Sequence, residues 1–168
     1  MLESSCLRLC PWADTPHSSA GLPTAPCRDI VHGATNSRLG FVYRRPTRLP
    51  FLKPIALELY EGDDASYLCS VRRSWCLPFG WRVRDAEDKV VGSISGSWIL
   101  DAGDRPVAFL RHASAAKVSF CGIDGAEWAE LTRQDGGGVF TFTGVPDDNP
   151  FLRMLLLAAA VLQADRGP

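Results

Sequence analysis

Hydrophobic and polar residues alternate along most of this chain, from about residue 40 to residue 143. Such alternation over four to eight residues is typical of a β-strand with one buried face. Short segments rich in Gly and Asp separate the alternating runs and predict turns. The predicted strands cover residues 40–43, 55–61, 66–73, 81–85, 90–94, 98–101, 106–110, 116–121, 127–133 and 139–143.

The last apolar segment has a different pattern. Residues 151–162 are apolar on every face of a helix, and Arg153 is the only charged residue among them. Asn149 followed by Pro150 predicts the helix start, because Asn caps free N–H groups and Pro fits the first turn. A helix that is apolar all round must be buried in protein or lipid. Residues 150–162 are well short of the roughly 20 residues that cross a bilayer, so we predict a helix enclosed by the strands.

A series of short strands followed by one apolar helix predicts a mainly β fold. No helices lie between the strands, which argues against a parallel sheet of βαβ units. Closing an antiparallel sheet into a barrel removes its exposed edges and creates an interior that must be filled. We therefore expect an antiparallel β-barrel domain at residues 39–166 that encloses its hydrophobic C-terminal helix. Residues 1–38, rich in Pro and Ser and without alternation, are expected to be a disordered extension.

Two consecutive hairpins form a local repeat. Asp85 aligns with Asp101, and Gly92 aligns with Ala108, each pair sixteen residues apart. An Asp at the end of a strand can fold its carboxylate onto the N–H groups of the following turn. This structural role accounts for both acidic residues, so we assign them no catalytic role.

These motifs, in this order, resemble the tubby C-terminal-like superfamily, and within it the phospholipid scramblase-like and LURP-one-related proteins. The resemblance covers about residues 41–164 and implies an antiparallel barrel, nominally twelve-stranded, threaded by a hydrophobic C-terminal helix. This domain is shorter than typical members, so we expect one or more strands to be missing or to lie within residues 46–54. No residue matches the family's phosphoinositide site, so no functional residue is carried over. The resemblance rests on residues 70–75 and 81–85, Val91-Gly92, Ile99-Leu100-Asp101 and Val107-Ala108.

Composition excludes several classes of protein. A hydrophobic content of 46% and a net charge of -1 describe a soluble globular protein and argue against general nucleic-acid binding. With no recognisable secretory or transmembrane segment, we expect a cytoplasmic protein, peripheral at a membrane if it binds lipid. The six cysteines show no disulfide framework. We expect no metal and no cofactor, because one set of potential ligands lacks the close Cys pairs of zinc sites: Cys6, Cys10, His17 and Cys27.

Two basic stretches without an acidic residue supply the candidate binding residues. Trp75, Phe79 and Trp81 are interspersed in the second stretch. Arginine beside an exposed aromatic ring can bind an anionic lipid headgroup while the ring lies at the membrane interface. The alternative interpretation is a solvated face of alternating strands, with Trp81 and Val83 pointing inward. The candidate lipid-binding residues are Arg44, Arg45, Arg72, Arg73, Arg82 and Arg84.

Catalytic chemistry finds little support in the sequence. His112 is the only histidine of the predicted domain, and Cys121 lies nine residues away without a third group to orient the pair. We therefore expect a non-enzymatic barrel that binds anionic membrane lipid or phosphoinositide. The alternative is a structural or protein-interaction scaffold with no small-molecule ligand. The expected partners are an anionic lipid surface or another protein, and not nucleic acid.

Overall fold

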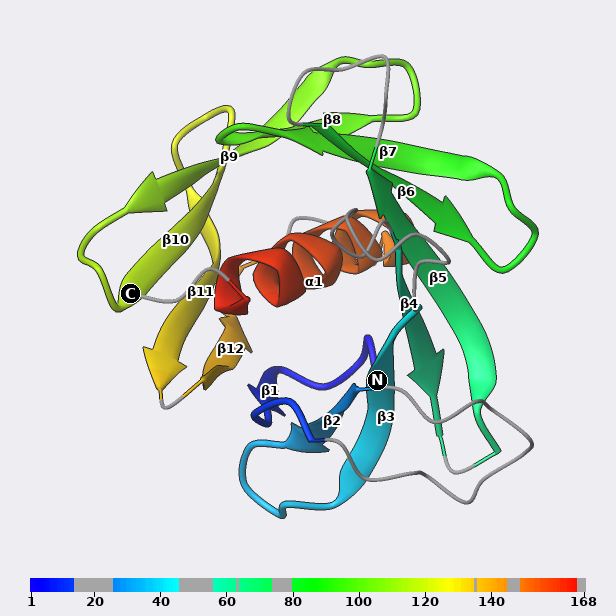
Figure 1. The fold of residues 1–168 in the computed structure, drawn as a ribbon. Helices are drawn as coiled ribbons and strands as arrows, with labels where there is room; N and C mark the ends of the chain where they lie inside the picture. The colour runs from blue at the N-terminus through cyan, green and yellow to red at the C-terminus, as the bar shows by residue number, and fades with distance from the viewer. Residues whose placement is uncertain are drawn as a thin grey trace, which may run out of the picture.

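The computed structural model describes residues 1–13, 26–45, 56–62, 64–73, 80–134, 136–144 and 149–165, which form twelve strands and one helix. The elements are β1 (Cys6–Leu9), β2 (Cys27–His32), β3 (Arg38–Arg44), β4 (Ala56–Glu61), β5 (Ser66–Arg73), β6 (Gly80–Asp85), β7 (Val90–Ser95), β8 (Trp98–Asp101), β9 (Pro106–His112), β10 (Lys117–Gly122), β11 (Glu127–Gln134), β12 (Gly137–Phe142) and α1 (Pro150–Ala164). Each strand pairs antiparallel with the next one along the chain, and β1 pairs with β12 to close the barrel (Figure 1). The fold is therefore the predicted antiparallel β-barrel.

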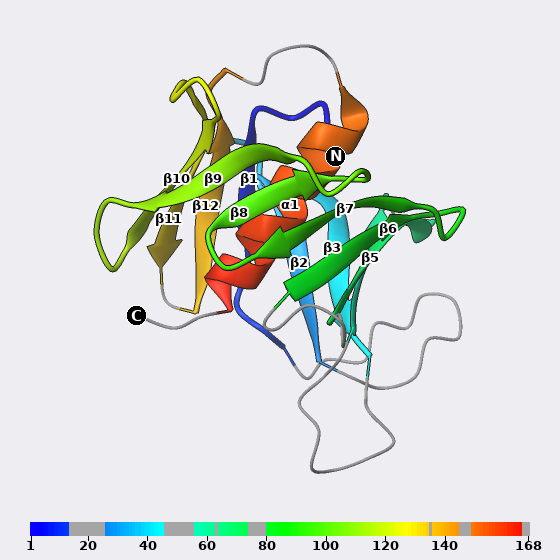
Figure 2. The same cartoon turned by 90° about the horizontal axis from the view of Figure 1, so that it is seen from above.

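The helix α1 runs through the middle of this barrel, as two perpendicular views show (Figures 1 and 2). The Asn149 side chain accepts hydrogen bonds from the main-chain N–H groups of Phe151 and Leu152, at 3.0 and 3.3 Å. Every residue from Met154 to Ala164 is buried. The predicted cap and the predicted enclosure are thus confirmed, and the helix ends two residues later than expected. In the described part of the chain, no helix is long and apolar enough to span a membrane.

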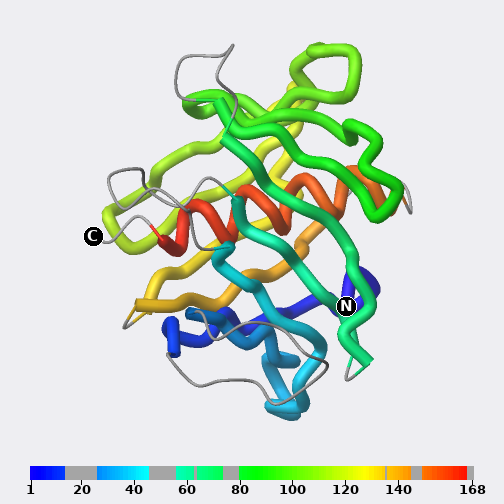
Figure 3. The backbone as a smooth tube through the Cα atoms, turned by 45° about the vertical axis from the view of Figure 1, so that its right-hand side comes forward, coloured from blue at the N-terminus to red at the C-terminus, as the bar shows by residue number. Residues whose placement is uncertain are grey.

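Alternate residues of each strand face α1 and form the core with it. Leu131 and Phe140, opposite each other on β11 and β12, are both fully buried. Gly92 on β7 is tightly surrounded, because a Cβ atom there would clash with the main-chain oxygen of Leu100 on β8 and lie 3.0 Å from both terminal methyl groups of Leu155 on α1. Its repeat partner, Ala108, carries a methyl group and is fully buried on β9. The tube view shows α1 passing between opposite walls of the barrel (Figure 3).

The N-terminal segment belongs to the barrel, which corrects the expectation of a disordered extension over residues 1–38. β1 fills the gap between β12 and β2, where its residues Leu7 and Leu9 are 0% and 1% exposed. With β1 and β2 the described strands number twelve and close the barrel, so the expectation that one or more strands are missing is wrong. Residues 14–25 and 46–54 lie outside the described residues.

The sixteen-residue repeat consists of two matching turns. One carboxylate oxygen of Asp85 accepts two main-chain N–H groups of its own turn, at 2.9 Å each. The corresponding oxygen of Asp101 accepts two at 2.8 and 2.9 Å. Asp88 and Asp104, the equivalent third residues of the two turns, both adopt a left-handed conformation, with φ of 60° and 58°. The turn-forming role predicted for both strand-end acids is confirmed.

Candidate functional site

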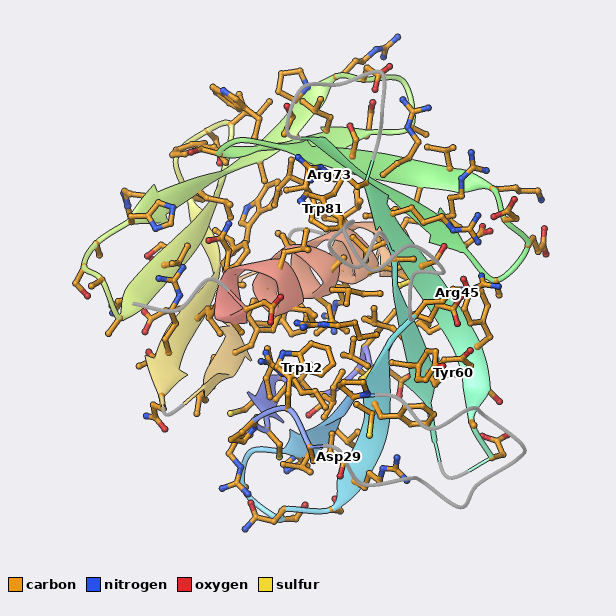
Figure 4. All side chains as sticks on the ribbon, in the orientation of Figure 1. Trp12, Asp29, Arg45, Tyr60, Arg73 and Trp81 are labelled. Carbon is orange, nitrogen blue, oxygen red and sulfur yellow. The ribbon has the colours of Figure 1, made fainter. Side chains whose placement is uncertain are left out.

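The structure divides the six predicted arginines between the two faces of the barrel wall. Successive residues of a strand point to opposite faces, so Arg72 and Arg73 at the end of β5 separate. Arg44 ends β3, and Arg45 continues the pairing by donating its main-chain N–H to the main-chain oxygen of Ala56, so these two separate in the same way. Val71 and Val83, paired across β5 and β6 and fully buried, mark the face toward α1. Arg44 and Arg73 share this inner side, where Arg73 and Trp81 lie within the ring of strands (Figure 4). The outer side carries the other four: Arg45, Arg72, Arg82 and Arg84.

Three outer arginines lie side by side, and we call Arg72, Arg82 and Arg84 the outer arginine patch. Arg72 on β5 is directly opposite Arg82 on β6, and Arg84 follows two residues later on the same face. Like charges directly opposite each other destabilise a sheet. Asp88 provides a compensating carboxylate, 3.7 Å from Arg72 and 3.5 Å from Arg84. The patch therefore carries more positive charge than this single acid can balance.

Arg82 is the least compensated member of the patch. Among the described residues it forms no ion pair, and its Nε atom is buried without a hydrogen-bond partner. Ser93, opposite Arg82 on β7, has a buried hydroxyl that also lacks a partner within the described part of the chain. Both groups lose hydration without gaining a protein hydrogen bond, which is costly unless a ligand or water supplies one.

Arg45 stands apart from this patch because its charge is already paired. Its guanidinium lies 3.2 Å from the Glu58 carboxylate, which also accepts a hydrogen bond of 3.0 Å from the Tyr60 hydroxyl. Burial, together with the contact to Glu58, raises the pKa of Tyr60 to about 12. Arg45 thus belongs to a balanced polar network and is a weaker anion-binding candidate than the patch.

Arg44 belongs to a different group at the C-terminal end of α1, and we call Trp12, Arg28, Arg44 and Asp165 the mouth cluster. Asp165 accepts a 2.7 Å hydrogen bond from Trp12 Nε1 and bonds of 2.7 and 2.8 Å from Arg44 Nη2. The guanidinium carbons of Arg44 and Arg28 lie 4.3 and 4.7 Å from the centre of the Trp12 ring. Figure 4 shows Trp12 beside α1, inside the ring of strands. Three of these four residues were not among the sequence candidates.

Arg28 is the most unusual residue of the mouth cluster because it is a cation that is 1% exposed. It lies opposite Val42, on the face of β2 that points into the barrel. Its Nη2 atom donates to the main-chain oxygen of Gly136 at 2.9 Å. Its Nε and Nη1 atoms have no hydrogen-bond partner among the described residues. Burial lowers the pKa of this guanidinium, and the nearby charge of Asp165 opposes that shift.

The histidine and cysteine that were weighed as a hydrolytic pair are not brought together. His112 is opposite Val118, whereas Cys121 is opposite Phe109, three positions along β10 and on the other face of the sheet. Burial raises the pKa of the Cys121 thiol, which disfavours the reactive thiolate. This pair therefore has neither the geometry nor the charge state of a catalytic dyad.

Of the cysteines that were weighed as zinc ligands, Cys6 begins β1, Cys10 directly follows that strand, and Cys27 begins β2. Cys6 is opposite Thr141 on β12, and Cys27 is opposite Tyr43 on β3. His17 is outside the described residues. Within the described ranges, no three His, Cys, Asp or Glu side chains are grouped so that they could hold a metal ion.

Comparison with known proteins supports the fold alone. No protein-family model matches this chain, and no curated protein matches its sequence. The structure is similar to an X-ray structure of a protein from Arabidopsis thaliana, with a TM-score of 0.58 and 13% sequence identity. The likeness covers 94% of this chain and 91% of the plant chain. At this identity it shows a shared fold, and a shared fold does not imply a shared activity.

Proposed function

We propose that this protein is a non-enzymatic binding module that holds anionic membrane headgroups, such as phosphoinositides, against the outer arginine patch. The observation that carries this proposal is the direct opposition of Arg72 and Arg82, with Arg84 beside them and Asp88 as the compensating acid. A phosphate group placed over these guanidiniums would reduce their repulsion and accept charge-assisted hydrogen bonds. Membership of the tubby-like superfamily, near the LURP-one-related proteins, is part of the same proposal. The order of the sequence motifs and the fold shared with the plant structure support it.

A direct test is flotation of the protein with vesicles of neutral phosphatidylcholine, with and without phosphatidylserine or phosphatidylinositol 4,5-bisphosphate. Each Lys or Arg near an anionic surface is worth about 1 kcal/mol, so R72E/R82E should weaken binding more than tenfold. The binding should also decrease as salt is added, because exposed charges are screened. R105E/R111E on β9 and its turn is a matched control, since it changes the net charge equally at another place. Equal binding to neutral and acidic vesicles, or equal loss in both variants, would contradict the proposal.

The partner acid offers a second variant with the opposite sign. Asp88 lies within 3.7 Å of Arg72 and 3.5 Å of Arg84, where it competes with any external anion. D88N should therefore strengthen binding to acidic vesicles. A variant that gains affinity is informative because misfolding does not produce it. Unchanged or weaker binding by D88N would argue against the outer arginine patch as the binding surface.

A protein-interaction scaffold is the second candidate function, and one observation favours it. Trp98 is 50% exposed on β8 and lies against Phe109 of β9, with ring centres 5.9 Å apart. Exposed aromatic side chains are enriched in protein interfaces. Substitution of Trp98 by Ala separates the two functions, because it should leave binding to acidic vesicles intact while weakening a protein contact at this face.

A further inference from the structure

We propose a second anion-binding site, separate from the outer arginine patch, in the mouth cluster at the C-terminal end of α1. It would bind a single phosphate group, with Arg28 and Arg44 as its cationic ligands. Asp165 would act as an internal competitor that holds Arg44 when no external anion is bound. The ligand class is a phosphomonoester or inorganic phosphate.

The charges of the mouth cluster do not balance. The cluster contains two guanidiniums, from Arg28 and Arg44, and the single carboxylate of Asp165, which is hydrogen-bonded to Arg44. Arg133, the cation of β11 on the same inner face, donates to the main-chain and side-chain oxygens of Gln163 at 3.0 and 3.1 Å. It therefore caps the last turn of the helix. Within the mouth cluster itself, two guanidiniums and one carboxylate leave one positive charge in excess.

The position of Asp165 is unfavourable for its own charge. It is the C-cap of α1, where the helix dipole places partial negative charge and disfavours a carboxylate. Its stability there depends on the hydrogen bonds from Trp12 and Arg44. Such a carboxylate is easier to displace than one in a neutral setting. This makes Asp165 a suitable stand-in for an external anion.

The donors of the cluster suit a phosphate better than the carboxylate that they now hold. Arg28 offers two N–H-bearing atoms, Nε and Nη1, that have no partner among the described residues. Arg44 and Trp12 provide the donors already directed at Asp165. A phosphate monoester has three terminal oxygens and up to two charges, so it can accept from more of these donors than a carboxylate.

Exposure defines how the ligand would enter. The side chains of Arg44 and Asp165 are 27% and 35% exposed, so a dissolved anion can reach them. Arg28 lies deeper, at 1% exposure. An entering phosphate would first replace the Asp165 carboxylate on Arg44 and then use the free donors of Arg28. Competition with Asp165 is thus the property to test.

The test is calorimetric titration of the whole protein with inorganic phosphate and with glycerol 3-phosphate. D165N keeps the size of the side chain and removes its charge, so it should bind phosphate at least tenfold more tightly than the wild type. Adding R44Q to D165N should abolish this gain. E127Q is the matched control, because it removes one carboxylate from an ion pair with Arg111 on the outer wall and should leave the affinity unchanged.

Further variants separate this site from the outer arginine patch and identify the source of the phosphate. R72E/R82E should leave phosphate binding by D165N unchanged, whatever its effect on vesicles. Tighter binding of D165N to vesicles with phosphatidylinositol 4-phosphate would identify a lipid headgroup, and a gain restricted to the soluble anions would identify free phosphate. The proposal is overturned if folded D165N gains no affinity, or if its gain survives both R44Q and R28M. Melting curves confirm folding, and the partly exposed Arg44 gives a readout even where loss of buried Arg28 destabilises the protein.

Discussion

Leu156 in the middle of α1 provides the sharpest test of the enclosed helix. Its side chain is 0% exposed and lies at the centre of the barrel. L156A removes buried methyl groups and leaves a cavity, at a cost of about 2–5 kcal/mol in the free energy of unfolding. We expect a value in the upper half of this range, because twelve strands hydrogen-bonded into a closed ring cannot easily collapse onto the cavity.

Thermal unfolding followed by circular dichroism measures this cost. For a domain of this size, 1 kcal/mol corresponds to roughly 2–4 °C in Tm, so a cost in the upper half of about 2–5 kcal/mol should lower the Tm of L156A by roughly 7–20 °C. F151A is the matched control in the first turn of the same helix, where the ring is 52% exposed. It removes a larger side chain but should cost only about 1 kcal/mol, since half of that surface is already in water. An equal Tm loss in the two variants would refute the enclosure of α1.

Three further predictions concern the wall of the barrel. Deleting residues 1–12 removes β1 and leaves β2 and β12 as open strand edges, so size-exclusion chromatography should show aggregation. A deletion variant that stays monomeric would contradict closure of the barrel by β1. G92A should lower the free energy of unfolding in urea by about 1–3 kcal/mol, because the added methyl group meets the main-chain oxygen of Leu100 and the side chain of Leu155. Wild-type stability would contradict this close packing at Gly92. The pKa of Tyr60, raised to about 12 by burial and by Glu58, lies above its usual value near 10. The folded state favours the neutral phenol, so the stability that Tyr60 contributes below pH 10 is lost as the pH rises toward 12. The Tm of Y60F should therefore fall less than that of the wild type between pH 10 and pH 12, and an equal fall in both proteins would contradict the raised pKa.

The sequence was sufficient to predict the helix, its cap and the strands from β3 onward, because their patterns are local. β1 and β2 were missed for physical reasons. β1 has only four residues, and β2 places the charged Arg28 at a position that faces the core, which breaks the expected alternation. A strand of this kind is recognised only when the partners on either side are known.

The candidate site was predicted in part. Residues adjacent in a strand must face opposite sides, so the pairs Arg44-Arg45 and Arg72-Arg73 already contained the signal that they cannot share one surface. The mouth cluster had no such signal, because Trp12 and Asp165 are 153 positions apart. An acidic residue just after an apolar helix was the one hint, since a carboxylate there opposes the helix dipole and calls for a nearby cation.

The pairing of β1 with β12 also constrains how the chain can fold during synthesis. Leu9 and Gly138, partners across this seam, are about 130 residues apart, and α1 follows them both along the chain. At a synthesis rate of about 5–20 residues per second, β1 waits about 7–26 s for its partner. During that time its apolar residues, and the inner faces of all the later strands, are exposed without the helix that covers them. The nascent barrel is thus an open, curved sheet with an exposed apolar inner face. Chaperones that shield apolar surfaces are therefore needed most before α1 is synthesised.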